Sequence, residues 1–313
     1  LQDTTKYHSG MALCMYKMQW SRSDIYNATQ DYVRHMSAPN ESYMKALKHL
    51  IKYTVGMTDQ GLVLYPDRLW DGSSEFKFRI HGRSDSDYAA NKDDRRSISG
   101  GVVFLEGCPI TFRSSMQKFV TLSVTEAESA AGVMVAQDML YVYRLMDSIG
   151  LSVELPMLLE MDNKGAVDLA NNWSVGGRTR HVDVRNHFLR ELKDEGLITV
   201  KHVSGDGNEA DIFTKNTAVT IKNTKSRKAM SDMDAAEISS NSCFLVFRLF
   251  IFSCKDVISK FSFLYLPNSF ERTFCSAVTS SISCLFCFVL DARVFRLFKS
   301  SLSTPFFCKA VAT

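Results

Sequence analysis

The stretch that decides the fold is Gly101-Val102-Val103-Phe104-Leu105, which runs into the turn residues Glu106-Gly107 and then into Ile110-Thr111-Phe112. Two short apolar segments on either side of a glycine-containing turn are typical of a β-hairpin. Just upstream, residues 76–80 alternate apolar and polar side chains, as a half-buried strand does. The sequence therefore predicts three consecutive strands joined by hairpin connections.

The residues that follow predict helices that alternate with two further strands. Residues 125–149 carry an apolar stripe at helical spacing, which predicts a long helix. The apolar runs at residues 157–161 and 197–203 have the length of strands. Three shorter helices are expected at residues 163–170, 182–193 and 209–215. Hairpin strands followed by strand–helix crossovers predict an α/β fold, with a five-stranded mixed sheet flanked by helices.

The chain divides into three parts by pattern. Residues 1–75 are predicted to be a small, mostly helical region, with apolar residues at helical spacing in residues 42–55 and a strand at residues 62–65. Residues 76–216 hold the predicted α/β domain. Residues 217–313 are predicted to be a linker and a tail that is disordered or non-native.

The tail has an unusual composition. Residues 231–313 contain 14 of the 21 Phe and 6 of the 8 Cys, without steady periodicity. Translated non-coding or frameshifted sequence is the favoured interpretation, and a membrane-associating tail is the alternative. Its longest apolar runs fall short of the ~20 residues that span a membrane. The pair Cys284-x-x-Cys287 lacks a second ligand pair at zinc-finger spacing, which argues against a metal site there.

Length, charge and cysteine usage limit the classes of protein to consider. The chain has 313 residues, room for about two domains, and a net charge of +3, which by itself does not indicate a nucleic-acid-binding protein. Only Cys14 and Cys108 precede the tail, which favours a reducing compartment over a disulfide framework. No signal peptide follows Leu1, and the missing initiator Met suggests a fragment of a longer product.

Four acidic residues stand where predicted strands end or helices begin: Asp85, Glu128, Asp162 and Asp211. In a mixed α/β sheet, strand ends and neighbouring helix N-termini can meet at one edge. Four carboxylates there repel one another unless cations intervene, and Mg²⁺ prefers such oxygen ligands. Two ions about 4 Å apart can activate a water and stabilise the leaving oxygen of a phosphodiester. The sequence therefore predicts a two-metal site.

Each acid also has a structural interpretation. Thr125-Glu126-Ala127-Glu128 matches a capping box, so that Glu128 could cap its own helix. Asp162 could be the N-cap of the next helix, and Asp211 would favour a helix N-terminus electrostatically. Asp85 could be a solvated turn residue, with Asp87 beside it as an equal candidate.

Six segments within residues 76–216 together resemble the ribonuclease H domain of copia-type long-terminal-repeat retrotransposons. They are Ser84-Asp85-Ser86-Asp87-Tyr88, Arg95-Arg96-Ser97-Ile98-Ser99-Gly100, Leu122-Ser123-Val124-Thr125-Glu126-Ala127-Glu128, Met161-Asp162-Asn163-Lys164, Arg178-Thr179-Arg180-His181-Val182-Asp183-Val184-Arg185 and Ala210-Asp211-Ile212-Phe213-Thr214-Lys215. The resemblance implies a ribonuclease H-like fold. It places the family's catalytic and metal-binding acids on Asp85, Glu128, Asp162 and Asp211, with Glu128 rather than Glu126 as the ligand.

The same resemblance implies an activity and a cofactor. The expected protein is a ribonuclease H endonuclease that hydrolyses the RNA strand of an RNA–DNA hybrid during reverse transcription. Two Mg²⁺ ions are the implied cofactor, with Mn²⁺ as a substitute. The expected location is the cytoplasm, in a retrotransposon particle, with the nucleus as an alternative.

The upstream region also fits this family. Tyr7-His8-Ser9-Gly10, residues 20–25 and Met44-Lys45-Ala46-Leu47 resemble the segment that joins reverse transcriptase to ribonuclease H, although the family usually has Pro where Ser23 stands. Residues 1–75 are thus a reverse transcriptase thumb- or connection-like region by resemblance. The implied partner is the upstream reverse transcriptase of the same polyprotein, with no membrane partner; the polymerase signature Tyr-x-Asp-Asp is absent from the chain.

Basic and amide side chains near these motifs are candidates for binding the phosphates of the hybrid: Arg113, Gln117, Lys118, Arg178, Arg180 and Arg185. The alternative is a solvated charged face, because acids interleave with the basic residues around Arg190 and Lys193. A zinc site from His181, His187 and His202 is disfavoured, because the first two lie on different faces of one helix. His202 is expected to be a satisfied strand-edge residue.

Two other functions compete with the nuclease. An integrase or transposase of the same fold expects two Asp followed by a Glu on a late helix, whereas here the Glu comes second. A relic without catalysis, which at most binds nucleic acid, is the other alternative. The intact set of acids argues against loss of chemistry.

Overall fold

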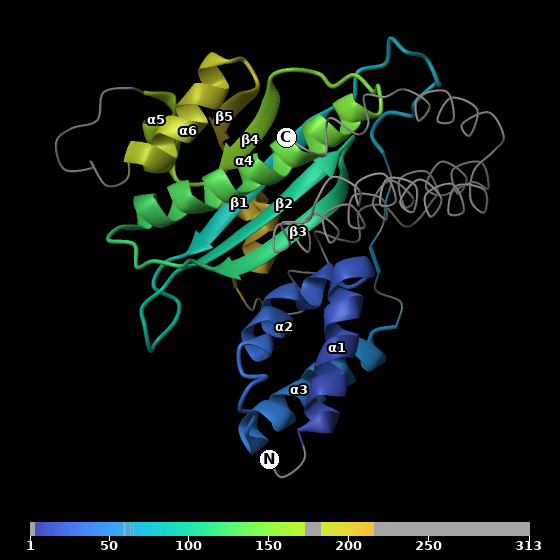
Figure 1. Ribbon diagram of the computed structural model, residues 1–313, viewed down its shortest axis with the longest axis vertical. Helices are drawn as coiled ribbons and strands as arrows, with labels where there is room; N and C mark the ends of the chain where they lie inside the picture. The colour runs from blue at the N-terminus through green and yellow to red at the C-terminus, as the bar shows by residue number, and fades with distance from the viewer. Residues whose placement is uncertain (1–3, 59–60, 63, 65, 173–182, 216–313) are drawn as a thin grey trace, which may run out of the picture.

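The computed structural model describes residues 4–58, 61–62, 64, 66–172 and 183–215. Figure 1 shows a group of helices built from the N-terminal residues beside a sheet that carries further helices. The predictions for the tail and for Arg178, Arg180 and His181 lie outside the described residues. Among the described helices, none is both long enough and apolar enough to cross a membrane.

A five-stranded mixed sheet forms the centre of the α/β part, with strand order β3-β2-β1-β4-β5. The strands are β1 (Ile80–Asp87), β2 (Ile98–Leu105), β3 (Cys108–Met116), β4 (Met157–Met161) and β5 (Ile198–His202). The first three pair antiparallel, and β4 pairs parallel with β1 and with β5. The predicted mixed sheet is therefore confirmed (Figure 1).

The first strand lies further along the chain than its pattern predicts. The alternating residues 76–80 mostly precede β1, and Phe78 makes only an isolated bridge to Val153. β1 itself is polar over its second half, because that half carries the candidate site. The strand expected at residues 62–65 is also wrong for its described members, since Leu62 and Leu64 lie outside any strand.

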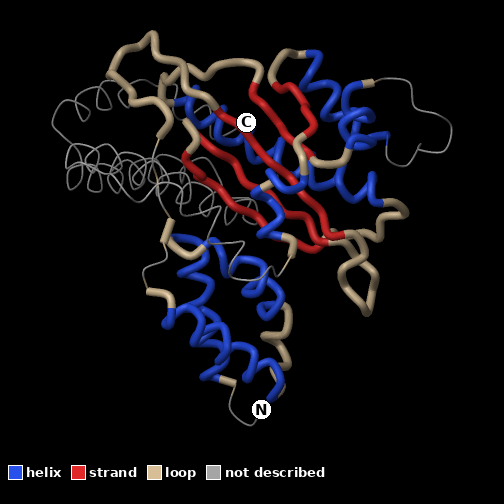
Figure 2. Tube along the Cα trace, turned by 180° about the vertical axis from the view of Figure 1, so that it is seen from behind, coloured by secondary structure: helices blue, strands red, loops and turns tan. Residues whose placement is uncertain are grey.

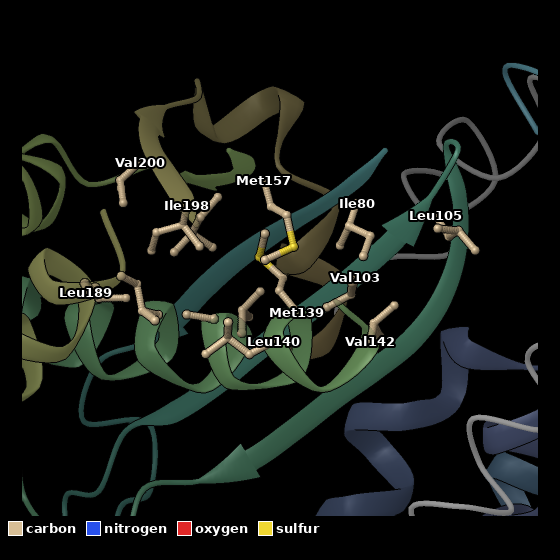
Figure 3. Packing of buried hydrophobic residues seen from close by; sticks show 14 of the residues in the cluster. Ile80, Val103, Leu105, Met139, Leu140, Val142, Met157, Leu189, Ile198 and Val200 are labelled. Carbon is tan, nitrogen blue, oxygen red and sulfur yellow. The ribbon is translucent and has the colours of Figure 1, made fainter. Parts of the chain in front are cut away.

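Three helices cover one face of the sheet: α4 (Val124–Ser148), α5 (Lys164–Asn171) and α6 (Asp183–Asp194) (Figure 1). Figure 3 shows side chains of α4, among them Met139 and Val142, facing strand residues such as Ile80. Burial of this apolar layer is the main force that holds α4 against the strands.

The opposite face carries the short 3₁₀ helix η3 (Glu209–Phe213) and the N-terminal helices. These are α1 (Thr5–Trp20), η1 (Ser23–Ile25), α2 (Tyr26–Val33) and α3 (Glu41–Gly56), seen from behind in Figure 2. A second apolar cluster joins them to the sheet, and it includes Tyr26 of α2, Phe112 of β3 and Phe213 of η3. The N-terminal region therefore shares a core with the α/β part.

Candidate metal centre

The centre begins with two neighbouring parallel strands. Ser84 of β1 lies opposite Met161 of β4 in the ladder, so the next residues, Asp85 and Asp162, emerge side by side. Asp162 directly follows β4, as predicted. Asp85 lies inside β1 rather than after the strand, and its side chain is almost fully buried.

The third acid comes from the long helix. Glu128 lies near the start of α4, where Ser86 of β1 donates to its Oε1 from the backbone N–H at 3.1 Å and from the hydroxyl at 2.8 Å. Its other oxygen, Oε2, is buried and has no hydrogen-bond partner among the described residues. Oxygens of Asp85, Glu128 and Asp162 lie within 4.8 Å of one another.

The capping interpretation of Glu128 is wrong. Ser123 caps α4, since its hydroxyl accepts from the backbone N–H of Glu126 at 3.1 Å. The carboxylate of Glu126 in turn accepts from the backbone N–H of Leu122 at 2.8 Å. The cap therefore begins two residues before Thr125, and it leaves Glu128 free to face β1.

The structural alternatives for the two aspartates also fail. Asn163, not Asp162, caps α5, because its side-chain oxygen accepts from the backbone N–H of Ala166 at 3.0 Å. Asp85 rather than Asp87 belongs to the group of three acids. Within the described residues, this group is the one set of His, Cys, Asp and Glu side chains whose geometry suits a metal ion.

The fourth predicted acid lies beside the other three, with a lysine between. Lys215 places its Nζ 2.8 Å from Asp211 Oδ1 and 3.7 Å from Asp85 Oδ2. The hydroxyl of Thr214 donates to Asp85 Oδ2. Neither Thr214 nor Lys215 is among the residues that the sequence predicts for the site; their spacing of three and four residues from Asp211 was the available signal.

Burial, and after it the charges of neighbouring acids, makes the three carboxylates harder to ionise. Burial, followed by the charges of Asp85 and Asp162, raises the pKa of Glu128 to about 8. Burial raises the pKa of Asp85 to about 6, although the Thr214 hydrogen bond acts in the opposite direction. Burial and then the Asp211 charge raise the pKa of Asp162. Such shifts are typical of carboxylates that share one buried site.

The three acids fit a divalent cation. Their oxygens are the hard ligands that Mg²⁺ prefers, and the buried acceptor Glu128 Oε2 receives no hydrogen bond from any described residue. A bound cation would satisfy this acceptor and offset the mutual repulsion. Asp85, Glu128 and Asp162 are thus the residues that would hold it, while Asp211 is paired with Lys215.

The predicted phosphate-binding residues differ in their surroundings. Arg113 pairs with Asp138 of α4, ten residues beyond Glu128 in the sequence and therefore about 15 Å along the helix. Gln117 is buried, and its amide donates to Ser99 Oγ at 2.8 Å and to the carbonyl of Ala127 at 3.0 Å. It therefore fastens β2 to α4 and is not available to a nucleic acid.

The remaining candidates are few. Lys118 is exposed, in the segment that leads to α4. Arg185 lies in α6, but its side chain is outside the described residues. Arg190 is buried and donates to the carbonyl of Leu169 at 2.9 Å, and Lys193 donates to that of Asn171 at 2.9 Å. These two fasten α6 to α5, so the solvated-face interpretation of the cluster is wrong for them.

His202 is satisfied by the backbone of one of the three acids. Its Nε2 lies 3.0 Å from the backbone oxygen of Asp162, at the exposed end of β5. His187 is exposed on α6. Neither belongs to a group of described residues with metal-binding geometry.

The strand order, together with acids in the second half of β1, directly after β4 and near the start of α4, defines a ribonuclease H-like protein. The chain is 32% identical over 209 residues to the retrovirus-related Pol polyprotein from transposon TNT 1-94 of Nicotiana tabacum, a match of 67% of this chain and 15% of that protein. It is 31% identical over 215 residues to the corresponding polyprotein from transposon RE1 of Arabidopsis thaliana, or 69% of this chain and 14% of that protein. The chain belongs to the copia-type retrotransposon Pol polyproteins and spans a small part of their length.

Comparison with solved structures gives a weaker likeness. The LC11 RNase H1 isolated from compost superposes with a TM-score of 0.35 at 18% identity, covering 49% of this chain and 99% of that chain. No family model matches the sequence. The strand order and the element order of this chain, and not these likenesses, define its fold.

Proposed function

We propose that this chain is a ribonuclease H endonuclease that hydrolyses the RNA strand of RNA–DNA hybrids by a two-metal mechanism during reverse transcription. The observation that carries the proposal is the convergence of Asp85, Glu128 and Asp162, with no donor to Glu128 Oε2 in the part of the chain that the structure describes. Ser123 and Asn163 cap the two helices in place of the acids, and Asp85 is buried rather than solvated.

Two divalent cations, when bound, would supply an activated water and stabilise the leaving oxygen. Asp85, Glu128 and Asp162 would hold one, and Asp211 together with Asp85 would hold the other. Ser86 fixes one oxygen of Glu128 through two hydrogen bonds, which leaves the second for a ligand. Thr214 fixes Asp85 from the side of η3. A ribose 2′-hydroxyl lets such a site choose RNA over DNA.

The wider setting is part of the same proposal. The substrate is an RNA–DNA hybrid, and Mg²⁺ is the cofactor, with Mn²⁺ as a substitute. The proposed phosphate contacts are Lys118 and three arginines whose side chains lie outside the described residues: Arg178, Arg180 and Arg185. The reverse transcriptase of the same polyprotein is the proposed partner, in a cytoplasmic retrotransposon particle. The similarity to Pol polyproteins supports these statements.

Cleavage of a labelled hybrid by the full chain in Mg²⁺ tests the proposal. Asp162→Asn should keep the fold and lower the rate by more than the about 100-fold that loss of an outer partner of a metal ligand can cause, because a neutral amide binds the cation poorly. Asp168→Asn, which neutralises an exposed acid on α5, is the matched control and should cut like the parent. Equal rates for Asp162→Asn and the parent, or no cleavage by the parent, would reject the proposal.

A further inference from the structure

One buried amide connects the N-terminal helices to the metal centre. Asn27 lies in α2 and is 4% exposed. Its Nδ2 donates to the backbone oxygen of Thr214 at 3.1 Å, and its Oδ1 accepts from the hydroxyl of Ser114 on β3 at 3.2 Å. The amide is thus held at both ends, between the sheet and the residue that follows η3.

Thr214 contacts both Asn27 and Asp85, the first acid of the centre. Its backbone oxygen is held by Asn27, while its hydroxyl donates to Asp85 Oδ2. The same residue lies tightly against β2, because a Cβ on Gly100 would come within 2.6 Å of Thr214 Cγ2. Gly100 is also the ladder partner of Asp85. The side chain of Thr214 therefore contacts two residues that lie opposite each other on β1 and β2.

We infer that Asn27 is a positioning residue of the metal centre, which fixes Thr214 so that the Thr214 hydroxyl orients the Asp85 carboxylate. The inference rests on the proposed function, since it assumes that Asp85 binds a cation. It makes the N-terminal helical region a part of the centre rather than a neighbour of it. Residues that orient metal ligands from outside typically change metal affinity by about 10–100-fold when removed.

A purely structural role for Asn27 predicts something different. A buried amide that only joins two elements would, on removal, lower the unfolding temperature and leave the metal affinity of the folded protein unchanged. A positioning role lowers the affinity, and it does so through Thr214. Affinity measured without substrate therefore separates the two roles.

The test is Mn²⁺ binding to the full chain, followed by electron paramagnetic resonance of the free ion, with unfolding temperature recorded in parallel. Asn27→Leu keeps the volume of the side chain and removes both hydrogen bonds, and it should weaken binding about tenfold. Thr214→Val removes the hydroxyl that reaches Asp85 and should weaken it by at least as much. The double variant should bind no more weakly than Thr214→Val alone, because the two residues act in one chain.

Thr29→Val is the matched control. Thr29 is buried in the same helix, and its hydroxyl has no hydrogen-bond partner among the described residues. This variant should bind Mn²⁺ like the parent. If Asn27→Leu does not fold, Asn27→Asp replaces it, because it retains the acceptor for Ser114 and loses the donor to Thr214.

Two results would overturn the inference: parental affinity in the folded Asn27 variant, or losses in the Asn27 and Thr214 variants that multiply in the double variant. Failure of the proposed function is a separate result. A parent that binds Mn²⁺ but does not cleave a hybrid rejects the nuclease, and the affinities still decide the role of Asn27.

Discussion

The ionisation of Glu128 depends strongly on the fold. Its pKa is raised from 4.5 to about 8, so the folded protein keeps a proton between these values that the unfolded chain has lost. The free energy of unfolding of the metal-free protein should therefore fall as pH rises from 4.5 to 8, by on the order of 5 kcal/mol at most for this group. Asp85 contributes in the same direction, up to its pKa of about 6.

Calorimetry in a chelator at pH 5 and pH 8 measures this effect. Glu128→Gln cannot ionise, so its stability should depend less on pH than that of the parent, and Mg²⁺ should restore the stability of the parent at pH 8. Glu195→Gln, which alters an exposed glutamate, should keep the parental slope. A Glu128→Gln variant that loses stability as steeply as the parent contradicts the raised pKa.

Lys215 supplies a positive charge beside Asp211 and Asp85 where a second cation would bind. Burial alone would lower the pKa of Lys215, but the hydrogen bond to Asp211 and the nearby acids raise it, so the amine is protonated at neutral pH. A divalent ion that uses Asp211 must displace this ammonium group.

Removal of the lysine should therefore favour the metal. Lys215→Gln is expected to bind Mn²⁺ several-fold more tightly than the parent, and to be less stable when metal-free because the acids then repel one another. Titration calorimetry measures the first effect. Lys48→Gln makes the same change of charge on α3 and should leave the affinity unaltered. Weaker binding by Lys215→Gln would show that the ammonium group assists the ion.

Among the elements, η3 depends on a single glycine of β2. A Cβ on Gly100 would lie 2.6 Å from Thr214 Cγ2 and 3.0 Å from the backbone oxygen of Ala210, so a side chain there must push η3 off the sheet. Gly100→Ala should cost about 1–3 kcal/mol of stability, and it should weaken Mn²⁺ binding as Thr214 moves away from Asp85. Gly56→Ala, where a Cβ meets nothing within 4 Å, is the control for both measurements.

The elements also show which patterns are informative. β4 has the bounds that the sequence predicts, because its apolar run is closed by Pro156 on one side and by Asp162 on the other. β1 was misplaced because its alternation is broken by Ser and Asp side chains that serve the site. The last predicted helix is a 3₁₀ helix that ends at Phe213, a distinction that composition over five residues does not carry.

The candidate acids could be predicted from the sequence because each lies near a strand end or a helix start, and strand ends at one edge of a sheet lie close together. The residues that support these acids could not be predicted in this way. The hydrogen bond from Asn27 to Thr214 joins residues 187 positions apart, and no local pattern predicts such a pair. Gln117 shows the converse, since a polar residue close to the site in sequence is turned into the interior.

For the whole molecule, the apolar cluster between the N-terminal helices and the sheet has a measurable consequence. Tyr26, Phe112 and Phe213 are buried in this cluster, which draws on both regions. A chain that lacks residues 1–58 should expose the sheet side of the cluster, bind a hydrophobic dye and unfold at a lower temperature than the full chain. Equal unfolding temperatures and no dye binding would show that the two regions are independent.

The metal centre takes its parts from segments that are far apart in the chain, and this has a consequence for the order of synthesis. A chain extended from the ribosome only as far as β5 already contains Asp85, Glu128 and Asp162. It still lacks Asp211, the proposed ligand of the second cation, and Thr214, whose hydroxyl donates to Asp85. Translation delivers these two residues last among the parts of the centre. The ability to hold a metal ion in a fixed geometry is therefore acquired late, after the sheet that supports it has been made.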